Sequence, residues 1–270
     1  MNIKPEQPVG IFDSGVGGLT VANAIRQVLP NENLIYFGDT AHLPYGDKSK
    51  ETINYYSNKI TEYLLSQGCK IIVIACNTAS ANAYESVLKL VNNQAVVVDV
   101  INPVINYVVN NPSIKNIGVI GTKGTINSGT YTRKIKDLNN NIRVASLPTP
   151  LFVPMIEEGF IFDDISNAII RSYLSKEELK DIDTLILGCT HYPIIKNQIN
   201  RFFNFKIEVI DSSMIVAEYL RDILKGKLLL NNNSKTDNKF YISDYTDYFK
   251  DISRLFFEEG INVKKLNFWN

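Results

Sequence analysis

Short runs of apolar, often β-branched residues alternate along this chain with longer stretches in which apolar residues recur every three or four positions. The short runs are typical of β-strands, and the longer stretches are typical of amphipathic helices. We expect strands at residues 9–12, 34–37, 70–75, 95–98, 117–120, 184–187, 207–210 and 240–242, and helices after Gly17 and at residues 51–65, 80–91, 164–174 and 213–224. Because alternating strands and helices build β-α units around a mostly parallel sheet, the pattern predicts an α/β fold.

Two of these strands end in the same way. Residues 71–78 read Ile-Ile-Val-Ile-Ala-Cys-Asn-Thr, and residues 184–191 read Thr-Leu-Ile-Leu-Gly-Cys-Thr-His. A second matching pair, residues 10–14 and 118–122, lies at a similar distance upstream of each cysteine. The repeat indicates two similar, pseudo-symmetric halves. In open parallel sheets, ligands bind beyond the carboxyl ends of the strands, so two facing halves would bring both cysteines to one cleft.

Length, charge and cysteine content narrow the class of protein. The 270 residues, 45% of them hydrophobic, suffice for one large or two modest domains and exclude disorder as the main state. The 28 basic and 28 acidic residues balance, which gives no indication of a nucleic-acid or membrane partner and favours a small-molecule substrate. No signal peptide or membrane span is apparent, so we expect a cytoplasmic protein. Three cysteines are too few for a disulfide framework or a structural zinc site.

Cys76 lies where a strand turns into a helix, and Asn77 or Thr78 is expected to cap that helix. Free backbone amides and the positive end of the helix favour a thiolate at this place. The ordinary alternative for a lone cysteine is a small buried apolar side chain. Cys69, which precedes its strand, fits that alternative well.

Cys189 has the same placement as Cys76 and has His191 as a close neighbour. Three interpretations remain open: a base beside a nucleophile, a pair of metal ligands, or a capped turn followed by Pro193. Metal binding is the weakest of them because no third and fourth ligands appear at a usual spacing.

Glycine-rich loops follow two of the strands, but neither matches a nucleotide-binding motif. Residues 13–20 lack the third glycine of G-x-G-x-x-G, since Thr20 stands there, and residues 118–125 have Lys123 where the P-loop requires glycine. The first loop suits a small charged ligand, or is a tight turn in which Asp13 caps the next helix. Residues 38–46 add backbone donors and Tyr45 to the same expected cleft.

Taken together, these segments resemble the glutamate racemases of the cofactor-independent aspartate/glutamate racemase superfamily. The resemblance rests on residues 10–21, 38–46, 75–80, 151–157, 187–193 and 240–241, in order over essentially the whole chain. It implies two similar α/β domains with the active site in the cleft between them. Residues 1–100 and 212–270 would form the first domain and residues 101–211 the second. It also implies a homodimer that uses no cofactor and no metal.

The resemblance assigns roles to individual residues. Cys76 and Cys189 would be the paired proton donor and acceptor thiols, with Asp13 assisting the first thiol, and Glu157 and His191 the second. The substrate-binding residues would be Asp13, Ser14, Pro44, Tyr45, Gly46, Asn77, Thr78, Thr190 and His191. Two departures are visible, because Leu43 and Thr149 stand where the family commonly has a cysteine before a proline.

The chemistry of the residues agrees with this assignment. Inversion of a chiral carbon by proton transfer requires a base on one face and an acid on the other, and two thiols in opposed halves meet that requirement. Donors such as Asn77, Thr78 and Thr190 would stabilise the carbanion through the α-carboxylate. The resemblance therefore implies racemisation of L-glutamate to D-glutamate, and with it the supply of D-glutamate for bacterial peptidoglycan.

Three alternatives remain open. Aspartate racemisation needs only a small change of pocket, because the two substrates differ by one methylene. A thiol hydrolase would use Cys189 with His191 and would leave Cys76 without a role. A non-catalytic amino-acid-binding module would need neither thiol.

Overall fold

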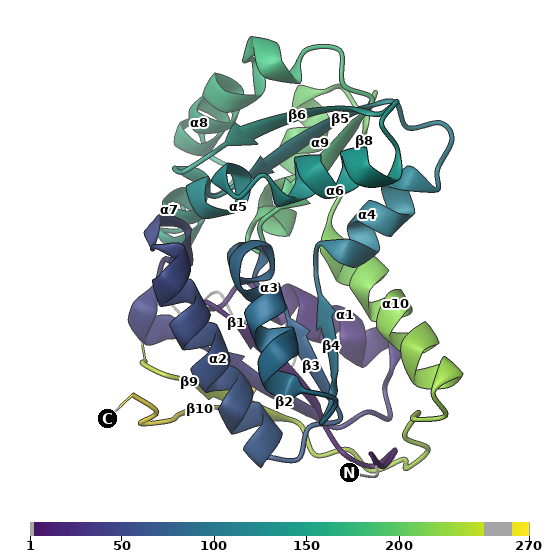
Figure 1. Ribbon diagram of the computed structural model, residues 1–270. Coiled ribbons are helices and arrows are strands. Elements are labelled where there is room, and N and C mark those ends of the chain that lie inside the picture. Colours follow the sequence, from purple (N-terminus) through teal and green to yellow (C-terminus); the bar gives the residue numbers. More distant parts are fainter. Residues whose placement is uncertain (1–2, 246–260, 270) are drawn as a thin grey trace.

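Two parallel sheets lie toward opposite ends of the molecule in the computed structural model, which describes residues 3–245 and 261–269 (Figure 1). The first sheet has the order β10-β9-β2-β1-β3-β4 and the second β6-β5-β7-β8, and every neighbouring pair is parallel. The strands are β1 (Val9–Asp13), β2 (Leu34–Gly38), β3 (Ile71–Ile74), β4 (Val96–Asp99), β5 (Asn116–Gly121), β6 (Arg143–Pro148), β7 (Thr184–Gly188), β8 (Glu208–Ile210), β9 (Lys239–Ile242) and β10 (Val263–Lys265). The predicted α/β fold with two parallel sheets is confirmed.

Helices connect the strands and cover the sheets. They are α1 (Leu19–Val28), α2 (Lys50–Ser66), α3 (Asn77–Val91), α4 (Asn102–Val109), α5 (Lys123–Asn127), α6 (Thr130–Leu138), α7 (Phe152–Glu157), α8 (Asp164–Leu174), α9 (Lys196–Phe202) and α10 (Ser212–Gly226). Short 3-10 turns lie at η1 (Thr40–His42), η2 (Tyr45–Asp47), η3 (Glu177–Leu179) and η4 (Tyr192–Ile195). Among the described residues, no helix is both long and apolar enough to cross a membrane.

Strand β1 divides the core because its successive side chains point to opposite faces of the sheet. Ile11 packs into the cluster that contains α1 and α10, whereas Phe12 packs into the cluster that contains α2 and α3. The first cluster continues into the second sheet through Ile120 and Leu187. The two sheets therefore share continuous apolar packing, which fixes the loops at the junction between them.

The first sheet contains strands from both ends of the chain. β9 pairs with β2, and β10 extends the same sheet, after the chain has passed through the whole of the second sheet. We propose that the domains divide at residues 100/101 and 211/212, as the sequence predicts. Strand β4, the last strand of the first sheet before the chain enters the second sheet, ends at Asp99. Helix α10, through which the chain returns to the first sheet, begins at Ser212. Both bounds support this division.

Candidate active site

The carboxyl ends of β1, β2 and β3 meet those of β5 and β7 at the junction of the two sheets. Thr190, after β7, donates a hydrogen bond to the Asp13 carboxylate at the end of β1 (3.3 Å). Thr78, at the start of α3, shares a hydrogen bond with Thr122, which follows β5 (2.8 Å). The strand-end loops of the two halves are therefore in direct contact.

Cys76 is buried and caps α3. Its Sγ accepts a hydrogen bond from the backbone N–H of Ala79 (3.4 Å) and donates to Ser14 Oγ (3.5 Å). The expected cap by Asn77 or Thr78 was wrong, because the thiol stands one residue nearer to the strand and reaches the free amide first.

The helix end favours a thiolate at Cys76, but two other influences oppose it. Burial and the negative charge of Asp13 raise the pKa of Cys76 to about 12, although the hydrogen bonds with Ser14 and Ala79 oppose that rise. The desolvation cost of a thiolate in a site this closed exceeds the stabilisation from one helix end. Cys76 therefore keeps its proton until a base takes it.

Asp13 is the carboxylate whose negative charge acts on the Cys76 thiol. It is 0% exposed, and its Oδ1 accepts a hydrogen bond from the Gly15 amide (2.9 Å). Burial raises the pKa of Asp13, while the charge of His191 and the backbone amides of Gly15 and Gly18 act in the opposite direction. A carboxyl group whose pKa is raised in this way is suited to accept and return a proton.

Cys189 has its own partners on the opposite side of the junction. Its Sγ lies 3.8 Å from His191 Nδ1, and His191 Nε2 lies 3.0 Å from Glu157 Oε1 at the end of α7. Burial lowers the pKa of His191, but the hydrogen bonds with Cys189 and Glu157, together with the negative charge of Glu157, outweigh burial and raise it well above 6.5. The imidazole is therefore protonated at neutral pH and can donate a proton toward Cys189.

Asn77 has a buried donor without a partner. Its Oδ1 accepts a hydrogen bond from Tyr131 of α6 (2.8 Å), which turns its Nδ2 the other way. Among the described residues, this Nδ2 has no hydrogen-bond partner. An unpaired buried donor costs free energy, about 1–3 kcal/mol, unless a ligand satisfies it. Tyr131 could not be predicted from the sequence, because it comes from the other half of the molecule.

The remaining predicted binding residues lie along the first half of the junction. Ser14 and Tyr45 are buried, and Pro44 is exposed at the outer end of the loop. Gly46 passes so close to Thr122 that an added Cβ would lie 2.7 Å from Thr122 Cβ. Thr78 is held by Thr122 and also by Thr125, at 3.2 Å between the hydroxyl oxygens. Thr122 and Thr125 were not among the predicted site residues.

Gly17 packs directly beneath the Thr190–His191 turn. A Cβ at this position would lie 2.4 Å from Thr190 Oγ1 and 2.6 Å from His191 Nδ1. Only glycine leaves room for this approach. The end of β1 and the loop after it thus serve both thiols, because Asp13 ends the strand and Gly17 of the loop packs against His191.

Comparison with known proteins shows which family this arrangement belongs to. Residues 19–220 match the model of the family described as Asp/Glu/Hydantoin racemase. The chain belongs to this family. A relative named glutamate racemase, from Geobacter metallireducens, is 42% identical over 241 residues, which cover 89% of this chain and 88% of that protein. The predicted resemblance is confirmed.

Solved structures of family members have a similar fold. The crystal structure of glutamate racemase from Francisella tularensis in complex with D-glutamate has a TM-score of 0.92 and 39% identity, and covers 98% of this chain and 99% of that one. An aspartate racemase from Picrophilus torridus has a TM-score of 0.57 and 21% identity, covering 83% of this chain and 99% of that one. The latter likeness extends to the fold alone.

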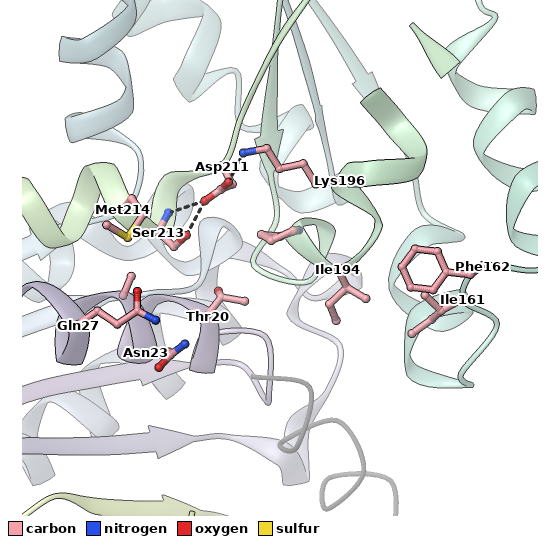
Figure 2. A pocket seen from close by; sticks show the side chains of 12 residues that line it. Thr20, Asn23, Gln27, Ile161, Phe162, Ile194, Lys196, Asp211, Ser213 and Met214 are labelled. Carbon is pink, nitrogen blue, oxygen red and sulfur yellow. Dashed lines mark hydrogen bonds and ion pairs between the residues drawn. The ribbon is translucent and has the colours of Figure 1, made fainter. Parts of the chain in front are cut away.

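A cavity of about 590 Å³ lies elsewhere in this racemase-family chain, between α1 and the start of α10 (Figure 2). Thr20 and Gln27 of α1 face Met214 across it, and Ile161 and Phe162 lie to one side. No predicted site residue lines this cavity. The candidate active site of this family member therefore lies at the two thiols, at the junction of the sheets.

The raised pKa of His191 makes a pH-dependent contribution to stability. Because the pKa is higher in the folded than in the unfolded chain, this contribution is complete below the unfolded value of 6.5 and is lost as the pH rises through the folded value. We expect Glu157→Gln to lower the free energy of unfolding by about 1.5–3 kcal/mol at pH 6, because it removes a charged hydrogen-bond partner. Urea titrations of both proteins at pH 6 and at successively higher pH values measure this, and a loss that does not shrink as the pH rises would contradict it.

Proposed function

We propose that this chain racemises glutamate by a two-thiol mechanism that needs no cofactor. The observation that carries the proposal is the pair of buried thiols at the carboxyl ends of two facing parallel sheets, each with its own proton-transfer partner. Asp13 serves Cys76, and His191 with Glu157 serves Cys189. An enzyme whose substrate and product are mirror images needs a base and an acid of comparable strength on the two faces of one carbon.

In one direction, Asp13 accepts the thiol proton of Cys76, and the resulting thiolate removes the α-proton of the substrate. Cys189 then donates its thiol proton to the opposite face of the carbanion, and the His191 imidazolium donates a proton to the new Cys189 thiolate. In the reverse direction the two thiols exchange roles. Each step moves one proton, so no electron acceptor is required.

The carbanion needs stabilisation because the α-proton of an amino acid is a weak acid. The unpartnered Nδ2 of Asn77 is suited to bind the α-carboxylate, where negative charge develops. Thr190 and the amides of the loop after β1 lie on the same side of the junction as Asp13. We assign Ser14, Pro44, Tyr45, Gly46 and Thr78 to the walls that enclose the rest of the substrate.

Glutamate is better supported as the substrate than aspartate. The relative at 42% identity and the structure at TM-score 0.92 are both named glutamate racemases, whereas the aspartate racemase shares only the fold. The hydrolase alternative would leave Cys76, Ser14 and Asp13 without a function, although they are buried together.

The direct test follows the optical rotation of L-glutamate, with L-aspartate in parallel, after addition of purified protein in reducing buffer without any cofactor. We expect the rotation to decay to zero with glutamate and to persist with aspartate. Decay with aspartate alone would identify aspartate as the substrate. A rotation that persists with both substrates would contradict the proposed function.

The proposed product suggests a role in the cell. D-glutamate is a building block of peptidoglycan, and we propose that the protein supplies it in the cytoplasm. Expression of the chain in a bacterium that depends on added D-glutamate should remove that dependence. Growth that still requires the supplement, despite folded protein, would contradict this role.

We further propose that the protein is a homodimer. Light scattering should then give twice the chain mass of 30.5 kDa. A mass of one chain at working concentrations would contradict the dimer without affecting the chemistry.

A further inference from the structure

A buried carboxylate beside the substrate-binding loop collects hydrogen bonds from three separate segments. Asp39 follows β2 and is 0% exposed. It accepts hydrogen bonds from Tyr45 Oη (2.7 Å), Ser243 Oγ (2.8 Å) and Trp269 Nε1 (2.7 Å), and His42 Nδ1 lies 3.0 Å from its Oδ2. A carboxylate removed from water needs such donors. The donors come from its own loop, from the end of β9 and from the segment after β10.

The contact with Asp39 sets the direction of the Tyr45 ring. Burial raises the pKa of Tyr45 well above 10, and the neighbouring Asp39 raises it further, so the hydroxyl remains a donor. The backbone N–H of Asp39 also donates to the carbonyl of Asp13 (3.0 Å). Since Gly46 follows Tyr45 and packs against Thr122, a turn of the Tyr45 ring would move the loop at the junction of the sheets.

Trp269 is held in place on several sides. Its ring makes edge contacts with His42 (4.7 Å between centroids) and Tyr56 (5.1 Å), and His42 stacks on Tyr56 (4.1 Å). The neighbouring Phe268 packs against Phe37 of β2 (4.8 Å). β10 pairs with β9, so the segment that follows it starts from a fixed strand. The indole N–H therefore reaches Asp39 from a rigid support.

We propose that Trp269 is a positioning residue for substrate binding: its indole N–H holds Asp39, Asp39 holds Tyr45, and the loop of residues 43–46 keeps the shape that binds glutamate. This role rests on the proposed function. Loss of one donor leaves Asp39 free to adopt other contacts and lowers the fraction of molecules with a competent loop. Apparent affinity falls by that fraction, whereas the chemistry of the bound substrate at Cys76 and Cys189 is unchanged.

The matched variants are Trp269→Phe, which removes the N–H and keeps an aromatic ring, and Val87→Ala, which weakens the same apolar cluster from α3. We expect Trp269→Phe to raise KM for L-glutamate by about 5–10-fold with kcat within about twofold, since a hydrogen bond to a charged group is lost. Val87→Ala should lower Tm and leave KM unchanged. Asp39→Asn should raise KM in the same direction as Trp269→Phe.

Measuring racemisation by the wild-type protein separates a failure of the proposed function from a failure of the positioning role of Trp269. An inactive unchanged protein would contradict the proposed function. An active one in which Trp269→Phe leaves KM unchanged, or lowers kcat and leaves KM as it was, would overturn the positioning role alone. Trp269 is the sole tryptophan of the chain, so its emission reports on this contact. Asp39→Ala, which removes the acceptor, should shift the emission to longer wavelength, and an unchanged spectrum would contradict the contact.

Discussion

Replacement of Cys76 or of Cys189 by alanine is expected to lower kcat for glutamate racemisation by about 10²–10⁴-fold, which is the usual effect of losing a general acid or base. Neither thiol can substitute for the other, because each serves one face of the α-carbon. The residues proposed to bind the substrate are not replaced, so KM should change little. Polarimetry with L-glutamate and with D-glutamate measures both directions, and we expect both to fail in each variant.

The chain provides its own control for this experiment. Cys69 is a third buried cysteine, and burial raises its pKa to about 12 as well. It lies before β3, against Gly10, away from the junction of the sheets. Cys69→Ala should keep full turnover after any loss of stability is taken into account. Full turnover of Cys76→Ala or Cys189→Ala would contradict the two-thiol mechanism.

Asp13→Asn is expected to lower kcat by about 10²–10³-fold, because asparagine cannot accept the Cys76 proton. The substitution should not unfold the protein. Burial raises the pKa of Asp13, so the charged form is disfavoured in the folded chain, and the resulting loss of stability sets in as the pH rises above 3.8. At pH 7 the neutral asparagine removes that cost, and Tm should stay the same or rise.

Asp99→Asn is the matched control for Asp13→Asn. Asp99 is also buried at the end of a strand, its pKa is also raised by burial, and it accepts hydrogen bonds from backbone amides, but it contacts neither thiol. Steady-state kinetics should show kcat retained in Asp99→Asn and lost in Asp13→Asn. Equal kcat values for the two variants would show that Asp13 has no special part in the proton transfer.

The strands that bear the thiols could be predicted because they are buried on both faces and therefore read as continuous apolar runs. Residues 71–74 and 184–187 have this pattern, and both lie in strands. The helix expected at 164–174 has the observed bounds of α8. β6 and β10 were not predicted, because Arg143–Pro148 is only half-buried and Val263–Lys265 is an edge strand with two lysines. Pairing with a neighbouring strand, and not local pattern, makes these segments strands.

The parts of the site that could not be predicted depend on contacts between distant residues. Tyr131 orients Asn77 from 54 positions away, and Trp269 reaches Asp39 from 230 positions away. Local spacing carries no signal for either contact. The protonation of Cys76 could not be predicted for a similar reason, because the sequence shows the helix that follows the thiol but not the burial that keeps its proton.

If each thiol serves one face of the α-carbon, as we propose, hydrogen exchange in D₂O will distinguish the two faces. Cys189→Ala and Cys76→Ala would each be incubated with L-glutamate and, separately, with D-glutamate, and loss of the α-proton signal followed by NMR. We expect each variant to exchange the α-proton of one enantiomer without inversion, and the two variants to act on opposite enantiomers. Exchange of both enantiomers by a single variant would contradict it, as would the same enantiomer being exchanged by both.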